Sequence, residues 1–141
     1  MLAHNVESRV IKASVESVWA TLKTQDFGFW TLVKSTESAF SSAEVGSTRT
    51  VTFTDGAVQV YRLVEFSELN NSLTYEVIES EPAMKVLSAT HRIRAFPVSA
   101  DNTTFVQWTS EFASEGASET VQDSKYKKLE ALADLAKALE N

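Results

Sequence analysis

Arg49 lies within a strand otherwise built of Val, Thr and Phe, and its guanidinium could do chemistry there. Residues 48–53 read Thr-Arg-Thr-Val-Thr-Phe, which predicts a β-strand, in which side chains two positions apart share a face. Arg49 therefore shares a face with Val51 and Phe53, and we expect it to point into an apolar interior. There it could bind a ligand carboxylate or an enolate oxygen through two hydrogen bonds. It could equally form an internal ion pair, for which the candidate partners are Glu65 and Glu79.

His91 is the one histidine that lies outside the first few residues of the sequence. If buried, it could act as a general acid or base near neutral pH, or it could be a hydrogen-bonded core histidine. Tyr61 and Tyr75 could each donate a hydrogen bond to a ligand carbonyl, or could simply pack half-buried. Lys34 could supply a second positive charge or lie on the surface. We take His91 and Arg49 as candidate catalytic residues, and all five as candidate ligand-binding residues.

Patterns typical of other functions are missing from the sequence. There is no HExxH, no paired Cys/His set, no Gly-rich phosphate loop and no GxSxG elbow, so we expect neither a metal nor a cofactor. The absence of cysteine excludes thiol and disulfide chemistry. A net charge of -6 without a basic block argues against nucleic-acid binding. No run approaches a membrane span or a signal peptide, so we expect a cytoplasmic protein. We also expect a monomer or weak dimer.

The spacing of apolar residues predicts the element order β-α-α-β6-α. A length of 141 residues suits one domain, taken as residues 1–141. We expect a strand over 4–13, a helix from an N-cap at Ser14 to Thr24, and a second short helix over 27–32 behind a cap at Asp26. Six strands should follow, over residues 35–42, 48–53, 57–66, 73–79, 86–96 and 104–112.

A long helix is expected over residues 121–139, with Ser118 as its N-cap. Its apolar positions are predicted to share one face: Val121, Leu129, Leu132, Leu135, Ala136 and Leu139. Charged residues should cover much of the rest: Lys125, Lys127, Lys128, Glu130, Asp134 and Glu140.

Seven antiparallel strands must bury one face of their sheet, and only the last helix is long enough to cover it. A strongly curved sheet cannot close fully on a single helix, so we expect a cavity between the two. Alternation along the strands gives the inward-facing residues. The predicted ligand-binding residues are Lys34, Arg49, Val51, Phe53, Tyr61, Leu63, Tyr75, Val77, Leu87, Ala89, His91, Trp108, Phe112 and Leu132.

The hairpin around Asp55-Gly56 allows two registers. A two-residue loop would place Arg62 on the face of Arg49, where the two like charges would oppose each other. A three-residue loop over 54–56, with Gly56 in a left-handed conformation, would instead place Tyr61 and Leu63 beside Arg49. We favour the three-residue loop.

The chain resembles the START-like, birch-pollen-allergen-like (SRPBCC) superfamily, in its polyketide cyclase/dehydrase branch. The resemblance rests on residues 13–19, on 45–49 followed by Asp55-Gly56, on 61–63 and on 73–77. Trp108 and the long terminal helix complete it, so that it covers essentially the whole chain. It implies a helix-grip fold, a seven-stranded antiparallel sheet around a long C-terminal helix with a large apolar cavity.

The resemblance implies a protein that binds or transforms small hydrophobic molecules such as polyketides, lipids or hormones. Two departures qualify it. Tyr61 stands where many relatives have a cavity glutamate, so a general base is missing there. Residues 32–35 are similar to the ligand-carboxylate motif of plant abscisic acid receptors, but the receptors' gate is replaced by Thr-Asp-Gly at 54–56.

We therefore expect a small-molecule-binding domain. One alternative is a cyclase, isomerase or dehydratase, in which His91 would move protons while Arg49 and the tyrosines stabilise an enolate. A second alternative is a protein-interaction module whose cavity is vestigial.

Overall fold

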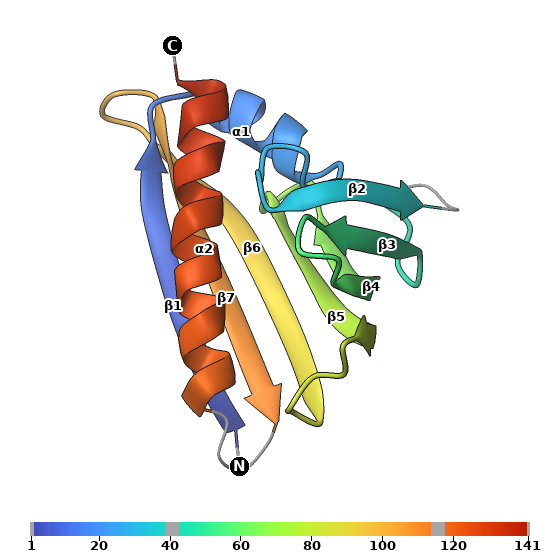
Figure 1. Ribbon diagram of the computed structural model, residues 1–141. Coiled ribbons are helices and arrows are strands. Elements are labelled where there is room, and N and C mark those ends of the chain that lie inside the picture. The colour runs from blue at the N-terminus through green and yellow to red at the C-terminus, as the bar shows by residue number, and fades with distance from the viewer. Residues whose placement is uncertain (1, 39–42, 114–117, 141) are drawn as a thin grey trace.

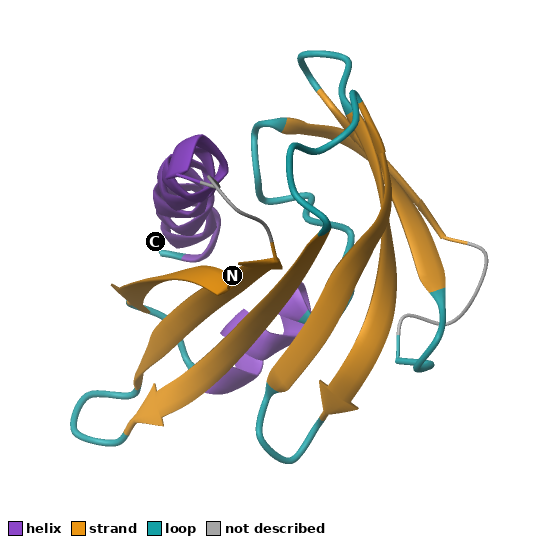
Figure 2. Ribbon diagram, turned by 90° about the horizontal axis from the view of Figure 1, so that it is seen from below, coloured by secondary structure: helices purple, strands orange, loops and turns teal. Residues whose placement is uncertain are grey.

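One curved antiparallel sheet and one long helix form the protein. The computed structural model describes residues 2–38, 43–113 and 118–140. The sheet has seven strands in the order β1-β7-β6-β5-β4-β3-β2, and the long helix α2 lies along β1 and β7 (Figure 1). Figure 2 shows the sheet bending round, so that its far strands lie on the same side as the helix. The fold is the predicted helix-grip, and its elements are β1 (Leu2–Ile11), α1 (Val15–Leu22), β2 (Val33–Ser38), β3 (Thr48–Phe53), β4 (Val58–Ser67), β5 (Ser72–Glu81), β6 (Ser88–Val98), β7 (Thr103–Ala113) and α2 (Ser118–Leu139).

Helix α1 begins where the sequence predicts. The Ser14 hydroxyl oxygen accepts the backbone N–H of Ser17 at 3.2 Å, which confirms the N-cap. The helix buries Val18, Trp19 and Leu22 against the sheet, and it ends two residues before the predicted end at Thr24.

The predicted second helix over 27–32 is wrong. Gln25 and Phe27 adopt positive φ angles of 58° and 54°, which a right-handed helix cannot contain. The Asp26 carboxylate accepts the backbone N–H of Gly28 at 2.9 Å, so it forms a local turn and does not cap a helix. The turn buries the rings of Phe27 and Trp30 in the core, and burying these two large side chains outweighs helix formation.

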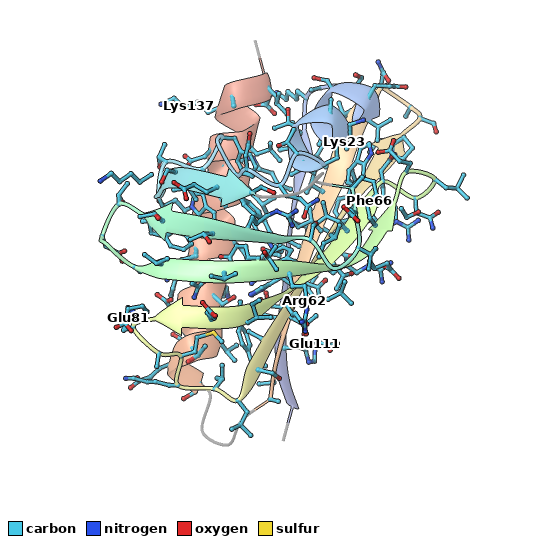
Figure 3. The ribbon with its side chains drawn as sticks, turned by 90° about the vertical axis from the view of Figure 1, so that its right-hand side faces the viewer. Lys23, Arg62, Phe66, Glu81, Glu111 and Lys137 are labelled. Carbon is cyan, nitrogen blue, oxygen red and sulfur yellow. The ribbon has the colours of Figure 1, made fainter. Side chains whose placement is uncertain are left out.

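The hairpin between β3 and β4 has the predicted three-residue loop. The backbone N–H of Phe53 donates to the Ala57 carbonyl at 2.8 Å, and Gly56 has a φ of 92°. Arg49 consequently lies opposite Tyr61. Arg62 points outward, where it is half-exposed and pairs with Glu76 (Figure 3).

Two element boundaries differ from the prediction in ways that matter for the site. Strand β6 begins only at Ser88, so Leu87 lies outside the sheet and is 89% exposed. Helix α2 already includes Ser118, which is therefore not its N-cap. Residues 39–42 of the predicted second strand lie outside the described residues. None of the helices in the described part of the chain is long and apolar enough to span a membrane.

The buried face of α2 is rotated from the predicted one. Its buried residues include Lys128, Ala131, Leu132 and Leu135, whereas Leu129 is 41% exposed. The prediction that Lys128 faces solvent is therefore wrong. The prediction that Leu129 lies on the buried face is also wrong. Positions 128, 131, 132 and 135 fit a helical period of three and four, so the spacing itself contained this face.

We expect Gly56→Ala to lower the free energy of unfolding by about 1–2 kcal/mol, since a left-handed backbone costs an L-residue that much. Nothing lies within 4 Å of an added Cβ at this position, so the loss would come from the backbone alone. Gly28→Ala is the matched control, because its φ is not left-handed and its Cβ would meet only Asp26, at 3.4 Å. Urea unfolding followed by tryptophan fluorescence measures both variants, and equal losses would contradict the hairpin geometry.

Candidate functional site

A cavity of about 730 Å³ lies between the sheet and the N-terminal half of α2. Its walls come from β3 to β7 and from the turn before β2, and they are rich in aromatic rings. The exposed side chains that line it lie at its rim, on the β3–β4 hairpin, on the end of β5 with the connection that follows, and on the first turns of α2. Glu81 marks this rim at the end of β5 (Figure 3). The aromatic wall consists of Trp30, Phe53, Tyr61, Tyr75, Trp108 and Phe112.

Phe27 holds the aromatic wall together from behind. Its ring centroid lies 5.8 Å from Tyr61, 5.6 Å from Tyr75 and 6.2 Å from Trp108. Trp30 in turn packs 5.9 Å from Trp108. Edge-to-face and offset contacts of this kind restrict the rings, so the turn over residues 25–30 fixes the shape of the cavity.

Tyr61 begins a chain of hydrogen bonds along one side of the cavity. Its hydroxyl donates to the Gln59 side-chain oxygen at 2.8 Å, and the Gln59 amide donates to the Ser80 hydroxyl at 3.4 Å. Ser80 donates onward to the carbonyl of Pro82 at 2.7 Å. Burial raises the pKa of Tyr61 well above its ordinary value of 10, so the phenol stays protonated and remains a donor.

His91 lines the same sheet wall, beyond Tyr75, and is neutral at physiological pH. Its ring lies 5.0 Å from Tyr75, and its Nδ1 is hydrogen-bonded to the Ser110 hydroxyl. Burial, and secondarily the charge of Lys128, lower the pKa of His91 to about 3. A histidine with this pKa is a poor proton carrier at pH 7, although it can still hydrogen-bond a ligand.

Lys128 is a buried cation that lines the cavity, although its charge predicted a place on the surface. The residue is 3% exposed, and its ammonium donates to the Ser124 hydroxyl one turn earlier. No carboxylate of the described residues lies within 4 Å of it. Burial lowers its pKa to about 7, while Glu7 acts in the opposite direction. At neutral pH the amine is therefore present in both protonation states.

Arg49 points inward as predicted, but it does not line the cavity. It is 2% exposed, and its guanidinium donates to the Gln25 side-chain oxygen and to the Ser47 hydroxyl, the latter at 3.1 Å. The alternative ion pair is also wrong, since no ion pair of the described residues joins Arg49 to Glu65 or Glu79. Arg49 thus ties the segment before β3 to the turn after α1.

The structure brings together part of the predicted site. Val51, Leu63 and Leu132 are buried in the core but do not line the cavity, whereas Lys34 and Leu87 are exposed and lie away from it. The prediction for Leu87 is wrong because strand β6 starts only at Ser88. The prediction for Lys34 is wrong because its side chain points to the solvated side of the edge strand β2. The predicted residues that do line the cavity are Phe53, Tyr61, Tyr75, Val77, Ala89, His91, Trp108 and Phe112.

We expect Arg49→Met to lower the free energy of unfolding by about 2–3 kcal/mol. The substitution removes a buried charged donor and the hydrogen bonds that it makes to Gln25 and Ser47. Affinity for cavity ligands should stay within about twofold in the variant that remains folded. Arg62→Met is the control, since its half-exposed ion pair with Glu76 should contribute no more than about 1 kcal/mol. Urea titration measures both losses. Equal losses, or a loss of ligand binding in folded Arg49→Met alone, would contradict the structural role of Arg49.

A family model described as polyketide cyclase / dehydrase and lipid transport matches residues 3–140. A protein from Nitrosospira multiformis is 26% identical, with a TM-score of 0.87 over 99% of this chain and 97% of its own. A putative uncharacterised protein from Bacillus thuringiensis is 20% identical, with a TM-score of 0.85 over 99% and 100%. The protein XoxI from Bacillus cereus is also 20% identical, with a TM-score of 0.85 over 97% and 95%.

The last two likenesses concern the fold alone. No curated protein matches the chain. The family match spans nearly every residue, and the helix-grip fold agrees with it. The chain therefore belongs to the polyketide cyclase/dehydrase and lipid transport family of the SRPBCC superfamily.

Proposed function

We propose that the protein binds a small, mainly apolar molecule in the cavity between the sheet and α2. The observation that carries the proposal is the cavity itself, whose volume of about 730 Å³ is within the usual range of roughly 300–1,000 Å³ for ligand pockets. Rings cover its walls, which favours apolar and flat ligands. A few buried polar groups, Lys128 above all, would orient the ligand.

The volume also favours ligand binding over the protein-interaction alternative. A vestigial cavity would be expected to fill with side chains, because protein interiors are close-packed and empty apolar space costs stability. Here Phe27 packs against the wall without entering the cavity, and the space in front of the wall stays open.

Catalysis is a second candidate, favoured by Lys128. A neutral lysine amine could take a proton from the carbon next to a ligand carbonyl, giving an ammonium and an enolate, and later return the proton to another carbon. The base would then be Lys128 and not His91, whose pKa of about 3 makes it too weak. Arg49 has no part in this version, because it does not line the cavity.

Filling the cavity should abolish binding. Ala89 is 1% exposed and lines the cavity, so we expect Ala89→Phe to weaken the binding of the neutral probe N-phenyl-1-naphthylamine at least about tenfold. Thr90→Phe, one position along on the other face of β6, is the matched control and should bind like the wild type. Probe fluorescence measures affinity, and thermal unfolding confirms that both variants are folded. Equal affinity in all three proteins would overturn the proposed site.

The catalytic candidate predicts proton exchange. We expect the wild type to accelerate exchange of the C1 protons of 2-tetralone with deuterated water, measured by NMR. In Lys128→Met the exchange rate should be at least about tenfold lower than in the wild type. Lys125→Met changes an exposed lysine of the same helix and should retain the rate. Exchange no faster than in buffer, with 2-tetralone shown to bind, would leave binding as the function and eliminate this catalysis.

A further inference from the structure

The deeply buried polar groups of the cavity wall include three hydrogen-bond donors from different elements. Lys128 of α2, Trp108 of β7 and Trp30 of the turn before β2 are each more than nine-tenths buried. All three line the cavity. A lysine ammonium and an indole N–H can donate hydrogen bonds but cannot accept them.

The two indole nitrogens have no hydrogen-bond partner among the described residues. The phenol of Tyr75 is a close neighbour of Trp108. Burial and then Tyr61 raise the pKa of Tyr75, while Trp108 acts in the opposite direction, yet the indole N–H does not meet a hydrogen-bond acceptor in suitable geometry. A buried donor without an acceptor costs roughly 1–3 kcal/mol. Both indole nitrogens expose less than 1 Å², so they face the packed wall and not the open space of the cavity, and Lys128 is the donor that a ligand can reach.

The carboxylates that line the cavity are not placed to satisfy these donors. Those of the described residues all belong to exposed side chains at the rim, and Asp123 there already pairs with Lys127 at 2.8 Å. Deeper inside, the Gln59 and Ser80 oxygens accept from Tyr61 and Gln59. The rim carboxylates are Asp55, Glu81, Glu119 and Asp123.

Lys128 is also a cation without a matching anion. Facing it are Glu7 from β1, which is not within ion-pair distance, and the neutral His91 from β6. On its own helix the next charges are Lys127 and Asp123, which neutralise each other. Burying an ammonium in this way is unfavourable unless something compensates. A ligand anion is the missing partner that the cavity can admit.

We propose that the ligand of this cavity is an apolar carboxylic acid, whose carboxylate binds Lys128. The inference rests on the proposed binding function and deepens it by naming the chemical class of the ligand. It also explains why a buried lysine lies among aromatic rings. An ion pair desolvated in this way discriminates strongly between an anion and a neutral isostere.

The test compares 2-naphthylacetic acid with its neutral amide. At pH 6.5 we expect wild type to bind the acid at least about tenfold more tightly than the amide, by calorimetry. Lys128→Met should lose this preference through weaker binding of the acid, with the amide unchanged. Lys125→Met should keep the preference.

The pH dependence gives a second readout. The amine of Lys128 has a pKa of about 7 in the free protein, and a bound carboxylate would raise it. Above pH 7 binding of the acid must therefore take up a proton, so the acid's affinity should fall between pH 7 and 9 while the amide's does not. Calorimetry in buffers of different ionisation enthalpy should report proton uptake at pH 8 in wild type and none in Lys128→Met.

The neutral probe N-phenyl-1-naphthylamine separates the two levels of failure. If it binds while acid and amide have equal affinity, or if Lys128→Met keeps the preference for the acid, the carboxylate inference is overturned and the binding function stands. If neither the probe nor either naphthyl ligand binds, both the proposed function and the carboxylate inference are overturned.

Discussion

The structure depends on a mismatch of widths between the sheet and its helix. Seven strands spaced about 4.8 Å apart make a face roughly 30 Å wide, whereas a helix with its side chains is about 10–12 Å across. Helix α2 can therefore cover only part of the face, and it packs along β1 and β7. The sheet curves to bring its other strands back toward the helix, and the space that remains is the cavity.

The two sides of that cavity have different physical roles. Behind the aromatic wall, the turn over 25–30 inserts Phe27, and Arg49 ties this turn to the segment before β3. These buried contacts fix the positions of the rings. Toward the rim, the hairpin and the first turns of α2 present charged, exposed side chains. The cavity therefore has a closely packed wall and a solvated rim.

Lys128 is the part of the molecule that stability alone does not explain. Its lowered pKa means that between about pH 7 and its ordinary value of 10.5 the unfolded chain holds a proton that the folded chain does not. Raising the pH through that window consequently increases the free energy of unfolding, and at lower pH the charged buried amine destabilises the folded state. Residues that cost stability and lie in a cavity are typical of functional sites.

The sequence by itself determined the periodic features of this protein. Alternation along the strands set which side chains face inward, as for Tyr75 and Trp108, because it depends on local geometry. At Asp55-Gly56 the sequence left two hairpin registers, and the like charges of Arg49 and Arg62 favoured the one that the structure has. The helical spacing of Lys128 with Leu132 also marked its burial, although its charge argued for the surface. Only the tertiary structure decided the left-handed turn at Phe27, the neutral partners of Arg49 and the volume of the cavity. Those depend on how distant segments pack around a curved sheet, and no local spacing encodes that curvature.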